Sequence, residues 1–244
     1  EYVAKDGAEA VSQARLGAGR ISTLILPADT AWGAAGQLVE PLKIEDRSNV
    51  SSDIIRKTAA ALASEGETLI HVTGRALRED TLEMLGKIQS KTGCRLSCMT
   101  ANGRWQRGAG RVAVERIEYP IDIALKQLSS VKDIILLGAQ VPVAFFAYPN
   151  KPSKLIPVDC NVHELASIDH DHYAVLAALV DELDANSAEP TIQQLTRPEP
   201  MSGDLNPNSI ASAIGHFTPE NAIIVDESVT TGRGFSPFTI GAKP

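Results

Sequence analysis

The sequence predicts an α/β protein with a Rossmann-like central domain, in which a mostly parallel sheet of about six strands is covered by helices on both faces and is flanked by partial α/β domains. Short apolar runs alternate with amphipathic helical patterns from residue 41 to residue 195, and parallel strands need crossover helices of this kind. The runs are apolar at successive positions, which is typical of strands buried on both faces.

The first 40 residues predict the end of an α/β domain. A helical pattern through Ala14 and Leu16 leads into a glycine-rich turn, and the apolar run from Ile21 to Leu26 then stops at Pro27. A strand as apolar as this one needs parallel neighbours, and no apolar run precedes it in the sequence. We therefore expect its sheet partners to lie elsewhere, and we interpret residues 1–40 as the tail of a preceding domain.

Residues 41–195 form the predicted central domain. Apolar runs at 68–72, 95–99 and 133–138 predict buried strands, and three further short runs follow at 143–149, 154–158 and 162–166. Helical patterns separate or close these runs at 51–66, 80–93, 119–128 and 169–185, and the first begins with a choice of N-cap residues, Ser51, Ser52 and Asp53.

Residues 196–244 predict a linker and the beginning of another α/β domain. The stretch around residues 185–207 is rich in Pro, Glu and Ser, as exposed linkers are. A helix is expected over Asn208 to His216, followed by a strand from Ala222 to Val225 and a hydroxyl-rich turn.

Composition excludes several classes of function. A net charge of -7 leaves no excess of basic side chains to neutralise phosphates, so we expect no nucleic acid partner. No apolar run approaches membrane-spanning length, and the three cysteines form neither a C-x-x-C motif nor an even disulfide set, so a cytoplasmic protein is expected. His170 and His172 lie close in sequence, but no acid and cysteine cluster completes a metal site, and we predict no metal ligands.

Four segments resemble one enzyme family, the thiamine-diphosphate-dependent decarboxylases and synthases, and among them the acetolactate synthase large subunits. The segments are ILPADTAWG, ANGRWQRGAGRVAVERIEYP, VPVAFFAYPNKPS and IIVDESVTTGRGF, in this order along the chain. The last one is also similar to benzoylformate decarboxylase. Members have an aminopyrimidine-binding domain, a central domain and a diphosphate-binding domain, so the resemblance assigns residues 1–40, 41–195 and 196–244 to the end, the whole and the start of these three.

The resemblance implies an enzyme with thiamine diphosphate and Mg²⁺ as cofactors, which decarboxylates a 2-oxo acid as a lyase or ligates the product to a second carbonyl as a transferase. Its partners would be the 2-oxo acid, the flanking domains of the same protein, and further copies in a homodimer or homotetramer. The activating glutamate and the GDG magnesium motif of the family are absent from these 244 residues. We therefore place no catalytic residue in this span and expect the span alone to be inactive.

By this resemblance the cofactor diphosphate would contact the turn Glu227, Ser228, Val229, Thr230 and Thr231, with Thr230 and the amide of Val229 first. Hydroxyl groups and free amides after a parallel strand suit an anion, although the same hydroxyls could simply cap a helix. Asp29 follows the first predicted strand and is a candidate for an interdomain or substrate-side contact.

The glycine-rich segment of residues 102–111, called the arginine loop below, carries Arg104, Arg107 and Arg111 after a strand end. This arrangement suits phosphate, as in FAD or ADP, or an interdomain contact. A non-catalytic nucleotide-binding Rossmann module, with an FAD, ADP or NAD-type ligand, is therefore the alternative to the enzyme, together with a benzoylformate decarboxylase-like lyase. No G-x-G-x-x-G motif supports the nucleotide reading.

Overall fold

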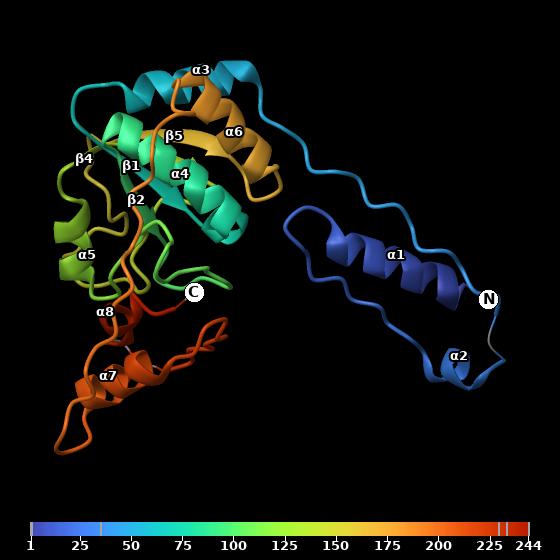
Figure 1. Ribbon diagram of the computed structural model, residues 1–244. Helices are drawn as coiled ribbons and strands as arrows, with labels where there is room; N and C mark the ends of the chain where they lie inside the picture. The colour runs from blue at the N-terminus through green and yellow to red at the C-terminus, as the bar shows by residue number, and fades with distance from the viewer. Residues whose placement is uncertain (1, 35, 229, 233, 244) are drawn as a thin grey trace.

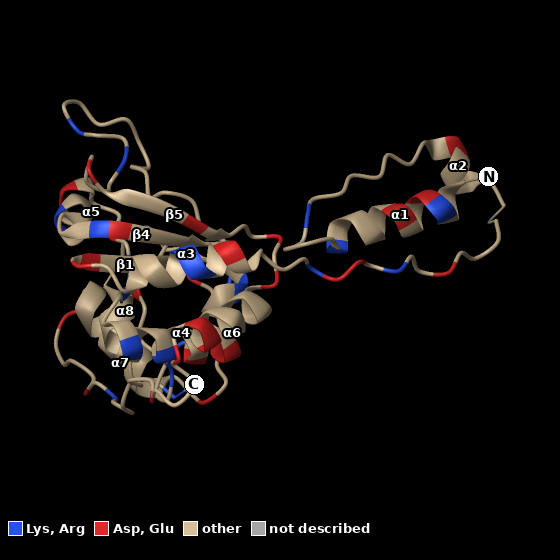
Figure 2. Cartoon of the chain, turned by 90° about the horizontal axis from the view of Figure 1, so that it is seen from above, with Lys and Arg blue, Asp and Glu red and all other residues tan. Residues whose placement is uncertain are grey.

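A computed structural model describes residues 2–34, 36–228, 230–232 and 234–243. It contains a sheet domain and an N-terminal arm, residues 2–34 and 36–47, which extends from that domain in two perpendicular views (Figures 1 and 2) and contacts it where the amide of Ala18 and the guanidinium group of Arg20 meet the carboxylate of Asp169. Helix α1 (Val3–Arg15) and helix α2 (Ala28–Trp32) both belong to the arm.

The sheet contains five parallel strands in the order β3-β2-β1-β4-β5. Their bounds are Glu67–Val72 for β1, Arg95–Cys98 for β2, Glu115–Arg116 for β3, Val131–Leu137 for β4 and Asn161–Ala166 for β5. This is the strand order of Rossmann folds, in which the chain reverses direction across the sheet between β1 and β4. The predicted fold class is therefore confirmed.

Helices cover both faces of this sheet. Helices α3 (Ser52–Leu62), α4 (Glu79–Thr92) and α6 (His172–Glu182) pack over one face, and α5 (Ile121–Leu128) packs over the other. Ser51 caps α3 by accepting a hydrogen bond from the amide of Ile54, and Asp171 caps α6 in the same way. These polar caps explain why the helices begin close to their predicted positions.

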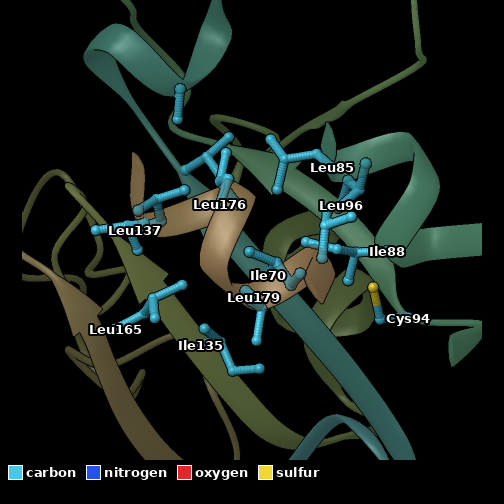
Figure 3. Packing of buried hydrophobic residues seen from close by; sticks show 14 of the residues in the cluster. Ile70, Leu85, Ile88, Cys94, Leu96, Ile135, Leu137, Leu165, Leu176 and Leu179 are labelled. Atoms are coloured by element: carbon cyan, nitrogen blue, oxygen red, sulfur yellow. The ribbon is translucent and has the colours of Figure 1, made fainter. Parts of the chain in front are cut away.

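The main core lies between the sheet and the three helices on its first face. Ile70, Ile135 and Leu137 of the sheet point toward Leu85 of α4 and Leu176 of α6 (Figure 3). Alternate residues of the same strands, such as Leu69 and Ile134, pack into a smaller cluster beneath α5. Both faces of β1 and β4 are thus buried, which accounts for their uninterrupted apolar sequences.

The predicted strand count of about six is one too high for the described residues. The runs at 143–149 and 154–158 form no strand, and a single antiparallel bridge joins Val143 to Lys154. Prolines at 142, 149, 152 and 157 remove backbone donors from this stretch, which explains the failure. Strand β3 was not predicted, because its two residues are both charged.

The two outer apolar runs are not paired in any sheet. Residues 21–26 and 222–225 carry no strand assignment, and Ile21 is fully exposed while Ile223 is 90% exposed. A strand requires neighbours to accept and donate its backbone hydrogen bonds. The strands expected at these runs therefore do not form among the described residues, and the expectation that their sheet partners lie elsewhere stays a prediction.

The C-terminal part packs against one end of the sheet domain (Figure 1). It contains α7 (Pro207–Phe217), capped by Asn206, and α8 (Phe235–Thr239). A short 3-10 helix, η1 (Gly74–Leu77), connects β1 to α4. The residues between α6 and α7, predicted to be an exposed linker, are partly tied to the sheet domain, because Ile192 bridges to Val112.

Candidate functional site

The carboxyl ends of the parallel strands carry the loops where α/β proteins bind ligands. The arginine loop follows β2, and η1 and the N-terminus of α4 follow β1. The segment of residues 226–232, called the cofactor turn below, precedes α8 in the C-terminal part. The predicted site residues therefore lie in three separate places, which are the arginine loop, the cofactor turn and, for Asp29, the N-terminal arm.

Arg107 connects the arginine loop to the C-terminal part. Its guanidinium group lies 5.0 Å from the ring centre of Trp105 and donates a hydrogen bond of 2.8 Å to the carbonyl oxygen of Ser236 in α8. Burial, and then the nearby positive charge of Arg116, lower the pKa of Arg107. Arg107 thus joins the arginine loop to α8 in the C-terminal part.

Arg111 is also engaged within the protein. Its guanidinium group pairs with Glu79 at 2.7 Å, and its backbone carbonyl accepts a hydrogen bond from the amide of Gln193 at 2.9 Å. The amide of Gly110 donates to the carbonyl of Gln193 in return. This end of the arginine loop holds the linker against the sheet domain.

Arg104, by contrast, is exposed and lies in an open depression at the N-terminus of α4 with Arg75 and Arg78. Each carboxylate that lines the depression pairs with a cation other than Arg78 or Arg104: Glu79 pairs with Arg111, Asp80 with Arg75 at 2.8 Å and Glu83 with Lys87 at 3.3 Å. Among the described residues, no carboxylate is within salt-bridge distance of Arg78 or Arg104.

Arg78 is the most unusual of these cations. Its Nε and Nη1 atoms are buried and have no hydrogen-bond partner among the described residues. Burial, followed by the positive charges of Arg104 and Arg75, lowers its pKa. Buried donors without acceptors are costly, so this depression is chemically suited to a small anion. Elsewhere the charges of both signs are interspersed over the visible helices (Figure 2).

At the start of the cofactor turn, Asp226 and Ser228 are hydrogen-bonded to each other and exposed to solvent. The carboxylate of Asp226 accepts hydrogen bonds from the amide and the hydroxyl of Ser228, which lower the pKa of Asp226. A Cβ atom on Gly232 would lie 1.6 Å from the Ser228 hydroxyl oxygen, so only glycine fits this approach.

The remaining predicted members of the turn lie beside this fold. Glu227, Thr230 and Thr231 are exposed, and Val229 lies outside the described residues. The exposed threonine hydroxyls are suitable donors to phosphate oxygens. The two carboxylates, Asp226 and Glu227, disfavour a bare anion, so a diphosphate there would need its accompanying cation. The donor set of the turn fits a magnesium diphosphate.

Asp29 is exposed in the first turn of α2, in the arm. The structure does not bring it together with the arginine loop or with the cofactor turn (Figure 1). It remains a predicted contact of the arm.

The histidines and cysteines serve the packing of the sheet domain. His71 is fully buried, its Nδ1 lies 2.8 Å from the Ser97 hydroxyl, and burial lowers its pKa to about 4. His172 is buried against Gly138. Burial raises the thiol pKa of Cys94 and Cys98 to about 11. Within the described ranges, no cluster of His, Cys, Asp or Glu could hold a metal ion.

Sequence reasoning did not single out Arg75 and Arg78, which line the open depression together with Arg104. Both lie in TGRALRED, directly after a buried strand and at the start of a helix. Basic residues between a buried strand and the start of the following helix are a sequence signal that would have indicated both arginines. Nothing in the local sequence indicates that Arg107 contacts a residue 129 positions away.

The fold is shared with thiamine-diphosphate-dependent enzymes of known structure. A 4-hydroxybenzoylformate decarboxylase of Rhodococcus jostii RHA1 superposes with a TM-score of 0.71 at 16% identity, over 100% of this chain and 49% of that chain. A benzoylformate decarboxylase of Polynucleobacter necessarius gives 0.67 at 14% identity, over 100% of this chain and 48% of that one. At these identities the comparison establishes the fold alone.

A curated relative comes from Mycobacterium tuberculosis strain H37Rv and carries the provisional name acetolactate synthase large subunit IlvX. It is 37% identical over 240 residues, which cover 98% of this chain and 46% of that protein. The chain therefore spans about half the length of the relative it matches, and the resemblance inferred from the four sequence segments is confirmed. No family model matches the chain. No helix among the described residues is both long and apolar enough to cross a bilayer.

Proposed function

We propose that this chain is part of a thiamine-diphosphate-dependent enzyme that decarboxylates a 2-oxo acid and passes the product to a proton or to a second carbonyl, as an acetolactate synthase does. The observation that carries the proposal is the similarity to the mycobacterial relative along 98% of the chain. Because that similarity includes the arm, the sheet domain and the cofactor turn, it supports a common arrangement of all three parts.

The cofactor turn would hold the diphosphate of thiamine diphosphate through the hydroxyls of Ser228, Thr230 and Thr231, with Mg²⁺ offsetting the charge of Asp226 and Glu227. When bound, the cofactor supplies the electron sink that decarboxylation of a 2-oxo acid requires. The residues of the turn bind and orient the diphosphate end. The sheet domain spaces the arm from the C-terminal part, and no residue of this span is assigned a proton transfer.

The exposed apolar runs support a multidomain, oligomeric enzyme. Burial of residues such as Ile21, Ile25 and Ile223, which are 84–100% exposed, would remove apolar surface from water and so stabilise an assembly. We propose that these runs enter sheets completed by the flanking domains, and that two or four copies of the protein associate. An acidic chain with free cysteines fits a cytoplasmic enzyme.

The test is a titration of the complete natural protein with thiamine diphosphate and Mg²⁺, followed by measurement of carbon dioxide release from pyruvate and from benzoylformate. Formation of an aldehyde indicates a lyase, and formation of a 2-hydroxy-3-oxo acid such as acetolactate indicates a synthase. The T230A/T231A double variant should bind the cofactor more weakly than wild type, whereas S202A, at an exposed hydroxyl of the linker, should not. Absence of cofactor binding in the wild type would refute the proposal.

A second candidate function is anion or nucleotide binding by the sheet domain, and the buried Arg78 donors without hydrogen-bond partners, with the exposed Arg104 in the same depression, favour it. Calorimetric titration with inorganic phosphate, ADP and FAD distinguishes a simple anion from a nucleotide. The R78Q/R104Q double variant should lose the binding, and R197Q, at an exposed arginine outside the depression, should retain it. Equal binding by both variants would exclude this site.

A further inference from the structure

Backbone hydrogen bonds join the arginine loop to the C-terminal part around Arg107. The amide of Ala109 donates to the carbonyl of Ala242 at 2.8 Å, and the amide of Thr196 in the linker donates to the carbonyl of Gly241 at 2.9 Å. A Cβ atom on Gly241 would lie 2.0 Å from the Thr196 hydroxyl oxygen, so the backbone at residue 241 approaches the linker closely. Residues 241 and 242 are therefore hydrogen-bonded both to the arginine loop and to the linker.

Arg107 contributes the side-chain contact of this junction. It comes from the sheet domain, stacks on Trp105 and donates to the carbonyl of Ser236. No carboxylate of the described residues is within salt-bridge distance of it. A partly buried cation without a counter-ion carries a desolvation penalty, so packing alone does not account for an arginine at this position.

A continuous series of contacts leads from Arg107 to the cofactor turn. Ser236 lies in α8, and the amide of Phe235 at the start of that helix donates to the carbonyl of Gly232 at 3.0 Å. Gly232 is in close contact with Ser228, which in turn donates its hydrogen bonds to Asp226. The positive charge of Arg116, from β3, also helps to lower the pKa of Asp226.

We propose that Arg107 is a positioning residue that fixes α8, and through it the cofactor turn, against the sheet domain. This inference rests on the proposed role of the turn in binding thiamine diphosphate. The sheet domain would thereby set the affinity for a cofactor that it does not touch. The arginine acts through α8 and makes no contact with substrate or cofactor.

The experiment compares R107Q with R197Q in the complete natural protein. Both remove one positive charge, but Arg197 is exposed and makes no hydrogen bond or ion pair among the described residues. R107Q should weaken the binding of thiamine diphosphate by on the order of tenfold, which is the loss expected for one charge-assisted hydrogen bond. R107K, which keeps the charge and a donor, should recover part of the affinity and also serves if R107Q does not fold.

Hydrogen exchange of the amides in residues 226–240 provides a readout that does not depend on the cofactor. R107Q should accelerate exchange there and leave the amides of β1 and β4 protected. If the wild type binds the cofactor and R107Q binds it equally, the positioning role is wrong while the proposed function stands. If the wild type does not bind thiamine diphosphate, the proposed function is wrong. Independently of that result, unchanged hydrogen exchange of residues 226–240 in R107Q would refute the positioning role of Arg107.

Discussion

Replacing His71 by asparagine is expected to reduce the loss of stability that the protein suffers in mild acid. His71 is fully buried in β1, and its Nε2 atom has no hydrogen-bond partner among the described residues. Because protonation would place a charge in an apolar interior, burial lowers the pKa of His71 from 6.5 to about 4. The folded protein therefore keeps this ring neutral where the unfolded chain protonates it.

The magnitude follows from the difference between the two pKa values. A histidine with a depressed folded pKa contributes stability that is fully present above the unfolded pKa and is lost as the pH falls toward the folded pKa. At pH 5, roughly 1.5 pH units below the unfolded value, the loss is about 2 kcal/mol, since each unit corresponds to about 1.36 kcal/mol. Asparagine can keep a hydrogen bond to Ser97 but does not titrate.

Urea unfolding of the wild type and of H71N at pH 7.5, 6.5, 5.8 and 5.0 provides the assay. The free energy of unfolding of the wild type should fall by about 2 kcal/mol more than that of H71N between pH 7.5 and 5.0. His172, whose pKa burial also lowers, is present in both proteins and cancels in the comparison. Parallel curves for the two proteins would show that His71 titrates with the same pKa in the folded and the unfolded protein, contrary to this reasoning.

Three further changes test the packing of the sheet domain. G138A should destabilise by about 1–3 kcal/mol more than G93A in urea unfolding, because both glycines have positive φ but only at Gly138 would the new Cβ meet a ring, that of His172, at 2.4 Å; equal losses would exclude the steric effect. I135A should lower the free energy of unfolding by about 2–5 kcal/mol through the cavity it leaves, and a loss below 1 kcal/mol would mean that the core collapses around it. R95Q should lower the free energy of unfolding by about 1 kcal/mol, because Arg95 pairs with carboxylates of β1 and β3. In thermal unfolding, high salt should reduce the difference in melting temperature between R95Q and the wild type. A difference that salt does not change would show that Arg95 acts through packing alone.

The helices and central strands could be predicted because their signals are local. Ser51 and Asp171 mark helix starts by offering side-chain oxygens to free amides, and β1 and β4 are apolar on both faces. The hydroxyl-rich turn could be proposed as a site from the sequence because its residues are contiguous, and its role in binding a cofactor stays a prediction. Strand β3 escaped prediction because pairing with β2, and not its own residues, makes it a strand.

The sequence by itself thus determined the Rossmann-like class and the approximate starts of the helices, because periodicity and hydrogen-bonding capacity are properties of neighbouring residues. The tertiary structure decided what each arginine does. Arg104, Arg107 and Arg111 look equivalent in the sequence, yet Arg107 binds α8, Arg111 binds Glu79 and Arg104 lines an open depression with Arg75 and Arg78. The partner of a long charged side chain depends on which distant segments the fold brings within reach, and no local pattern encodes that choice.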